Sequence, residues 1–211
     1  MVQSSSDRSF PLFEQTARWF ERAQAALLGE LPCRHGCSHC CVGIFPITLL
    51  DEQMIQLGLN VLPDSRRERV VEVAVAQVSQ LTETVPQLLT SRFVDTWPEA
   101  DYESVIEQGS AWPCPALESN GGCAIYLFRP LVCRSMGIPP EDTGLVDGAC
   151  QVQTAVPLIR LSNTLREEEN RLAAREAEEL EALRQRQGIK GEELLLPFAF
   201  MPEESTQPSL A

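Results

Sequence analysis

The sequence predicts a mainly α-helical protein, with packed helices around an irregular, cysteine-rich metal-binding core and a long charged helix near the C-terminus. Two observations carry this prediction. Apolar residues recur at helical spacing in four segments, and no segment alternates apolar and polar residues as a half-buried strand would. The 8 cysteines lie between these segments, in stretches rich in glycine, proline and short polar residues that favour turns.

The first predicted helix runs from Pro11 to about Leu28. Proline suits the first turn of a helix, and Gly29 follows the last apolar position, where glycine is common. Residues 1–9 are polar and serine-rich, so we expect a disordered tail there.

Two further helices are expected after the first cysteines. Thr48 is a good N-cap, and Asp51 three residues later can close a capping box, so a short helix should begin there and stop near Gly58. A longer helical pattern runs from about Asp64 to Leu89, where Pro86 should kink or end it. Residues 92–122 are punctuated by proline and glycine and are expected to be irregular.

The last helix is predicted from about Ser162 to Gln187, with acids and arginines at i, i+4 spacing and Gly188 at its end. The apolar tail E-L-L-L-P-F-A-F-M-P should fold back as a hydrophobic strap. We therefore expect a cysteine-cluster metal-binding domain over 10–160, the helix and strap over 161–200, and a disordered tail over 201–211.

The charge pattern argues against some partners. The chain carries 30 acids against 17 bases, a net charge of −13, and it has no basic stripe that would attract nucleic acid or an anionic membrane. No segment reaches the roughly 18–20 apolar residues that span a bilayer, and the N-terminus lacks a secretory signal. We therefore expect a cytoplasmic protein, in which reduced thiols bind metal rather than form disulfides.

The cysteines form two groups. Cys33, Cys37, Cys40 and Cys41 fill an early cysteine window (residues 33–41), and Cys114, Cys123, Cys133 and Cys150 follow much later. Eight thiols divide into two four-ligand sites, so we expect all eight to bind more than one metal ion per chain. Zinc, iron or an iron–sulfur cluster would each suit thiolate ligands. Because neighbouring side chains point apart, Cys40 and Cys41 should serve different centres, or one of them should not bind metal.

Other side chains could support the thiolates. Arg129 and Arg134 flank Cys133, where a guanidinium would offset thiolate charge and donate hydrogen bonds, and Tyr126 could donate its hydroxyl. The alternatives are arginines paired with carboxylates at the surface, and a tyrosine packed in the core, which we favour for Tyr126. Both histidines, His35 and His39, lie in the early cysteine window; they are either metal ligands or, as we favour, turn residues.

Four motifs follow one another in a recognisable order. The early cysteine window precedes Ile47–Glu52, then C-P-A-L at 114–117, C-A-I-Y-L-F-R-P-L-V-C-R at 123–134, and finally Cys150. Over about residues 30–155 this order resembles the CxxCxxCC cysteine-cluster family (YkgJ type), which implies a zinc- or iron-chelating domain.

Two classes of function fit these observations. In the first, the cysteine cluster binds zinc or iron in a structural, metal-trafficking or accessory role, with a client protein as a further partner. In the second, an iron or iron–sulfur centre with an open position serves an oxidoreductase or modifying enzyme. No phosphate loop, Ser–His–Asp set or general acid–base pair stands out in the sequence, which favours binding over catalysis.

Overall fold

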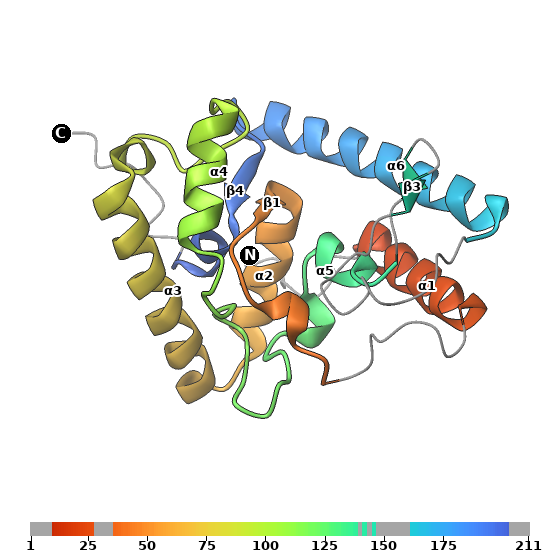
Figure 1. The fold of residues 1–211 in the computed structure, drawn as a ribbon, viewed down its shortest axis with the longest axis horizontal. Helices are drawn as coiled ribbons and strands as arrows, with labels where there is room; N and C mark the ends of the chain where they lie inside the picture. Colours follow the sequence, from red (N-terminus) through yellow and green to blue (C-terminus); the bar gives the residue numbers. More distant parts are fainter. Residues whose placement is uncertain (1–9, 28–35, 139–140, 143–144, 147–160, 203–211) are drawn as a thin grey trace, which may run out of the picture. The chain divides into compact units, whose positions relative to one another are not determined.

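The computed structural model describes residues 10–27, 36–138, 141–142, 145–146 and 161–202. These residues form six α-helices and two small two-stranded antiparallel sheets, so the prediction of a mainly α-helical protein is confirmed (Figure 1). The chain divides into two compact units: a helical unit of residues 1–32 and 134–178, and a cysteine unit of residues 33–133 and 179–211. No helix in the described part of the chain is long and apolar enough to cross a membrane.

The helical unit contains α1 (Pro11–Ala26), the short pair β2 (Glu141–Asp142) and β3 (Leu145–Val146), and the first part of α6 (Asn163–Gln187). Its buried apolar cluster comprises Trp19, Ala23, Leu27, Ile138 and Leu161. The indole N–H of Trp19 donates to the Leu165 carbonyl at 2.9 Å, which satisfies the one polar group of this buried side chain. The expected first and last helices are both confirmed.

The cysteine unit begins its regular structure with β1 (Pro46–Thr48), α2 (Leu49–Val61) and α3 (Asp64–Thr84). Thr48 and Asp51 form the expected capping box at the start of α2. Pro86 follows the end of α3 and opens the short 3-10 helix η2 (Pro86–Leu89), as expected from the missing amide hydrogen of proline.

The prediction that the short helix stops near Gly58 is wrong, because α2 continues to Val61. Gly58 is buried inside this helix, and a Cβ there would lie 2.8 Å from the Phe128 Cβ and 3.1 Å from the Ile125 Cβ. The glycine therefore allows a close approach between α2 and the 3-10 helix η3 (Tyr126–Phe128), rather than ending the helix.

The prediction of an irregular stretch over 92–122 is also wrong in part, because α4 (Glu99–Gln108) lies within it. This helix buries only Val105, so it needs no broad apolar stripe, and the sequence shows none there. The local signals are nevertheless present: Pro98 precedes the helix, two acids lie in its first turn, and Gly109 follows its end.

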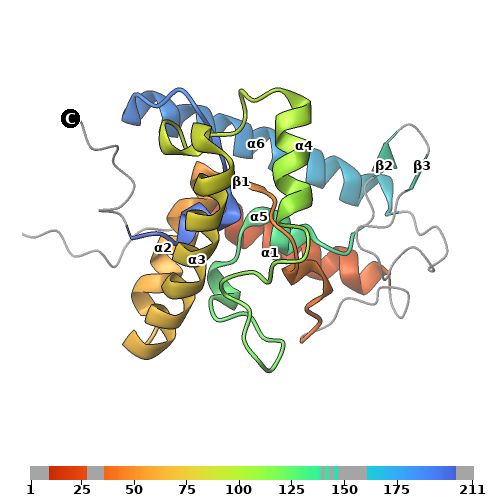
Figure 2. The same ribbon diagram turned by 60° about the vertical axis from the view of Figure 1, so that its left-hand side comes forward.

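The C-terminal strap is confirmed and lies at the centre of the cysteine unit. Strand β4 (Glu193–Leu195) pairs antiparallel with β1, with Ile47 opposite Leu194. The 3-10 helix η5 (Leu196–Phe200) follows, and it contacts both α2 and α3 (Figure 2). Every residue from Leu194 to Phe200 is buried, so the strap forms much of the core of this unit.

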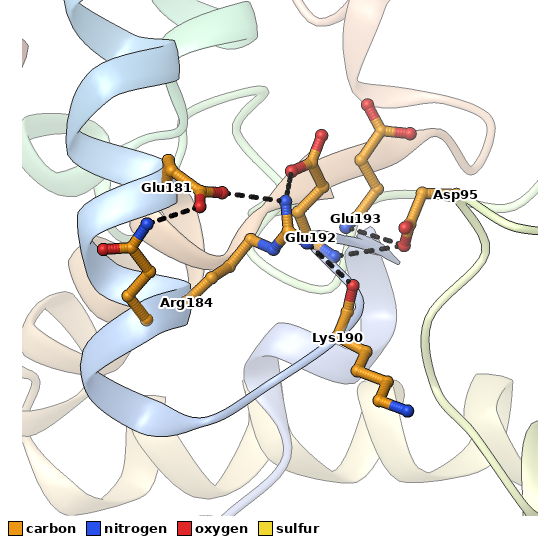
Figure 3. Close-up of polar contacts among 7 residues, drawn as sticks. Asp95, Glu181, Arg184, Lys190, Glu192 and Glu193 are labelled. Carbon is orange, nitrogen blue, oxygen red and sulfur yellow. Dashed lines mark hydrogen bonds and ion pairs between the residues drawn. The ribbon is translucent and has the colours of Figure 1, made fainter.

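Polar contacts fix the turn between α6 and β4 (Figure 3). Gly188 ends α6 with a positive φ of 66°. The Arg184 guanidinium donates to Glu192 at 2.8 Å and to the Lys190 carbonyl at 3.1 Å. Asp95 Oδ1 accepts the backbone N–H groups of Glu192 and Glu193 at 3.1 and 3.2 Å, which holds the start of the strand.

Candidate metal centre

The cysteine unit contains six described cysteines, all of them partly buried free thiols: Cys37, Cys40, Cys41, Cys114, Cys123 and Cys133. The other predicted ligands, Cys33 and Cys150, lie outside the described residues, as does His35. His39 is exposed in the 3-10 helix η1 (His39–Cys41).

Backbone pairing joins the early cysteine window to the C-P-A-L segment. The Cys114 N–H donates to the Cys41 carbonyl at 2.8 Å, and the Gly43 N–H donates to the Trp112 carbonyl at 2.7 Å. Val42 and Pro113 form an antiparallel bridge between these two bonds. Two cysteine groups that are far apart in sequence are therefore neighbours in the fold.

The segment from Cys114 to Cys123 folds back on itself. The Leu117 N–H donates to the Cys114 carbonyl at 2.9 Å, and Leu117 pairs with Cys123 in an antiparallel bridge. Ala124 N–H donates to the Ala116 carbonyl at 2.8 Å and extends this pairing by one step. The turn between the two arms contains Gly121 with a φ of 80°, which explains a glycine at that position.

Cys133 is presented by the short helix α5 (Leu131–Ser135). The first residue of this helix is tied to α2, because the Leu131 N–H donates to Asp51 Oδ1 at 2.7 Å. Asp51 is only 2% exposed, so this bond is shielded from water.

The thiols of Cys40, Cys41, Cys114, Cys123 and Cys133 lie close enough to influence one another's protonation. Burial, followed by the charges of Cys114, Asp51, Cys40 and Cys123, raises the pKa of Cys133 well above its ordinary value. Burial also raises the pKa of Cys114 to about 12, with smaller contributions in the same direction from Cys123 and Cys40. These thiols therefore resist becoming thiolates together unless a cation offsets their charge.

The adjacent thiols Cys40 and Cys41 influence each other's pKa. They share a hydrogen bond, which lowers the pKa of Cys40 to about 6 and raises that of Cys41. The assignment of Cys40 and Cys41 to different centres stays a prediction. Both residues lie in the tight 3-10 turn of η1, to which the side-chain alternation of an extended chain does not apply.

The donor set fits a thiophilic metal such as zinc or iron, since thiolate sulfur is a preferred ligand of both. Within the described part of the chain, no three Cys, His, Asp or Glu side chains are already arranged to hold one ion. Metal binding would therefore require some of these thiols to rotate toward a common point, and Cys33 and Cys150 remain further predicted ligands.

The structure places the predicted supporting side chains as follows. The Arg129 guanidinium lies 4.0 Å from the centre of the Tyr126 ring. Its charge is one of the smaller causes that lower the pKa of Cys40, and it offsets part of the rise that burial causes in the pKa of Cys123. Tyr126 is 42% exposed, so the expectation of a core tyrosine is wrong. Arg134 is 6% exposed and lies over the Phe13 ring at 5.4 Å, which excludes a surface arginine.

Helix α3 supplies contacts that the sequence analysis missed. Gln77, which is buried, donates from Nε2 to the Pro113 carbonyl at 2.8 Å, directly before Cys114. Glu118, between Cys114 and Cys123, accepts from Arg66 at 2.7 Å and from Arg69 at 3.3 Å. No periodicity or motif marks these residues, because each contact joins segments that are distant in sequence.

The site and its motifs define the class of protein. Residues 32–151 match the CxxCxxCC family, described as "Putative zinc- or iron-chelating domain", and the chain belongs to this family. The resemblance seen in the sequence is thus confirmed. Neither the curated proteins nor the solved structures contain a significant match to the chain.

Proposed function

We propose that this chain binds zinc or iron through thiolates of its cysteine cluster, in a structural, metal-trafficking or accessory role. The described candidate ligands are Cys37, Cys40, Cys41, Cys114, Cys123 and Cys133. Membership of a family of zinc- or iron-chelating domains supports metal binding in general, and the choice of ligands rests on the arrangement of the thiols.

The observation that carries the proposal is the gathering of thiols from four separate segments. The Cys41 carbonyl accepts the Cys114 N–H, and the thiols of residues 40–41, 114, 123 and 133 influence one another's pKa, although a long stretch of chain separates the first segment from the others. Helices α2 and α3 hold these segments through Asp51, Gln77 and the ion pairs of Glu118. Three polar contacts therefore hold the cysteine-bearing segments in place, which supports binding of one metal by several of these thiols.

The raised pKa values of the buried thiols make thiolate formation depend on a bound cation; without one, the same values describe inert, protonated thiols. Several neighbouring cysteines have a raised pKa, so deprotonating all of them is unfavourable without compensation. A divalent cation reverses this balance, because coordination stabilises each thiolate directly. Arg129 adds a fixed positive charge that favours the thiolates of Cys40 and Cys123.

The proposal includes two finer statements. The chain holds more than one ion, because eight cysteines exceed the four ligands of a single tetrahedral site. It works in a reducing compartment such as the cytoplasm, where the six described free thiols would not be oxidised to disulfides. Metal ions are its partners, together with a client protein if it delivers metal.

Elemental analysis of anaerobically purified protein tests the proposal. Wild type should contain zinc or iron, and the absorption spectrum separates the two because zinc thiolates are colourless whereas iron–sulfur centres absorb visible light. Cys133→Ser should lose metal, while Ser119→Ala, at an exposed position between two cysteines, should retain it. Wild-type protein with less than one zinc or iron per chain after anaerobic purification would contradict the proposal.

A further inference from the structure

Asp51 uses its two carboxylate oxygens for two different helix starts. Oδ2 accepts the Thr48 N–H at 3.2 Å, as a capping box requires at the start of α2. Oδ1 accepts the Leu131 N–H at 2.7 Å, at the first residue of α5 and 80 positions away in sequence. A local cap needs only the first of these bonds.

The second bond determines where Cys133 lies. Helix α5 spans only Leu131–Ser135, so fixing its first residue fixes the position of Cys133 two residues later. The carboxylate is 2% exposed, and without it the Leu131 N–H would be a buried donor with one acceptor fewer.

From this geometry we propose that Asp51 is a positioning residue of the metal centre, which holds Cys133 toward the other thiols by anchoring the start of α5. The inference rests on the proposed metal-binding function. It assigns to Asp51 a role beyond capping α2, and it does not make Asp51 a metal ligand.

The charge of Asp51 and its anchoring position predict opposite effects of Asp51→Asn on metal affinity. Asp51 accepts the N–H two residues before Cys133, and a carboxylate near this thiol disfavours the thiolate because like charges repel. If charge alone mattered, Asp51→Asn would make the thiolate easier to form and would tighten metal binding. If position matters more, the same variant weakens binding, because an amide presents one oxygen and one N–H₂ to two N–H donors.

The test compares Asp51→Asn with Thr48→Ala. Thr48→Ala removes the hydroxyl that accepts the Asp51 N–H at 3.4 Å, so it damages the same capping box but leaves the Asp51–Leu131 bond in place. Zinc affinity is measured by competition with a chromophoric chelator, and cobalt substitution reports sulfur ligation through its visible absorption. We expect Asp51→Asn to bind zinc about 10–100-fold more weakly, with a changed cobalt spectrum, as for other residues that orient metal ligands.

Thr48→Ala should keep the wild-type zinc affinity and cobalt spectrum even if it unfolds at a lower temperature. Asp51→Glu, which keeps the charge but displaces the oxygens, should also bind zinc more weakly and provides the test if Asp51→Asn does not fold. Wild-type affinity in both Asp51 variants, or an equal loss in Thr48→Ala, would overturn the positioning role.

A readout without metal separates this inference from the proposed function. In metal-free protein under native conditions, alkylation of Cys133 is followed by mass spectrometry of its peptide. Faster alkylation of Cys133 in Asp51→Asn than in Thr48→Ala supports the anchoring role even if wild type binds no metal. Equal rates in wild type and Asp51→Asn would refute the role whatever the metal content.

Discussion

Replacement of Gly58 by alanine tests the packing that holds the cysteine loops against α2. The added Cβ would lie 2.8 Å from the Phe128 Cβ and 3.1 Å from the Ile125 Cβ, whereas carbon atoms pack at about 3.5–4.0 Å. Both contacted atoms are attached directly to the backbone, so rotating a side chain cannot relieve the clash. The 3-10 helix η3, which lies between Cys123 and Cys133, would have to move away from α2.

Two opposing terms set the size of the effect. Alanine gains about 1 kcal/mol over glycine in a helix interior, whereas overpacking a close contact costs about 1–3 kcal/mol. We therefore expect Gly58→Ala to lower the free energy of unfolding by about 1 kcal/mol, measured by urea denaturation. The matched control is Asn60→Ala at an exposed position of the same helix, which should leave stability unchanged or raise it by about 0.5 kcal/mol. A Gly58→Ala variant more stable than wild type would show that α2 and η3 do not pack as closely as described.

Three further outcomes follow from the cysteine unit. Glu118→Gln, which weakens two ion pairs with α3, should lower stability in urea by about 0.5–1 kcal/mol, whereas Arg67→Gln, which breaks the more exposed pair with Asp64 and keeps that acid at the helix start, should have no measurable effect. Phe200→Ala should lower it by about 3–5 kcal/mol because this side chain is 1% exposed in the core, whereas Val61→Ala, at a 66% exposed position, should change it by less than about 0.5 kcal/mol; similar losses in both variants would contradict the buried strap. Burial and the nearby Asp95 and Glu192 raise the pKa of Glu193, so its protonated form favours the folded state, and stability is lost as the pH rises through that pKa. Glu193→Gln should therefore be more stable than wild type at pH 7, with a smaller difference below pH 4. Thermal melts that show the same difference at both pH values would contradict the raised pKa.

Much of the helical framework was predictable from local signals. Helices α1, α3 and α6 combine apolar periodicity with clear ends at Pro11, Pro86 and Gly188. Helix α4 was missed because Val105 alone is fully buried within it. Gly58 was wrongly predicted to end a helix. A glycine is needed there because residues far along the chain pack against it, and a local sequence pattern does not contain that contact.

The candidate ligands could be proposed from the sequence, but their arrangement in the fold could not. The number and spacing of the cysteines identified the candidate ligands, because every cysteine side chain offers a sulfur donor in whatever fold it lies. The pairing of Cys41 with Cys114 depends on backbone hydrogen bonds, which carry no side-chain signature. Asp51 was recognised only as a cap, since its bond to Leu131 spans 80 positions. Cys40 and Cys41, which influence each other's pKa, lie in the tight turn of η1, which alternation rules for extended chains do not describe.

X-ray absorption at the metal edge of anaerobically purified protein tests thiolate metal binding most directly. Zinc bound by the cysteine cluster should show mainly sulfur neighbours at about 2.3 Å. The number of sulfur neighbours per metal should fall in Cys133→Ser, or that variant should lose metal. Bound metal surrounded only by oxygen and nitrogen at about 2.0–2.2 Å would place it outside the cysteine cluster and contradict the proposed centre.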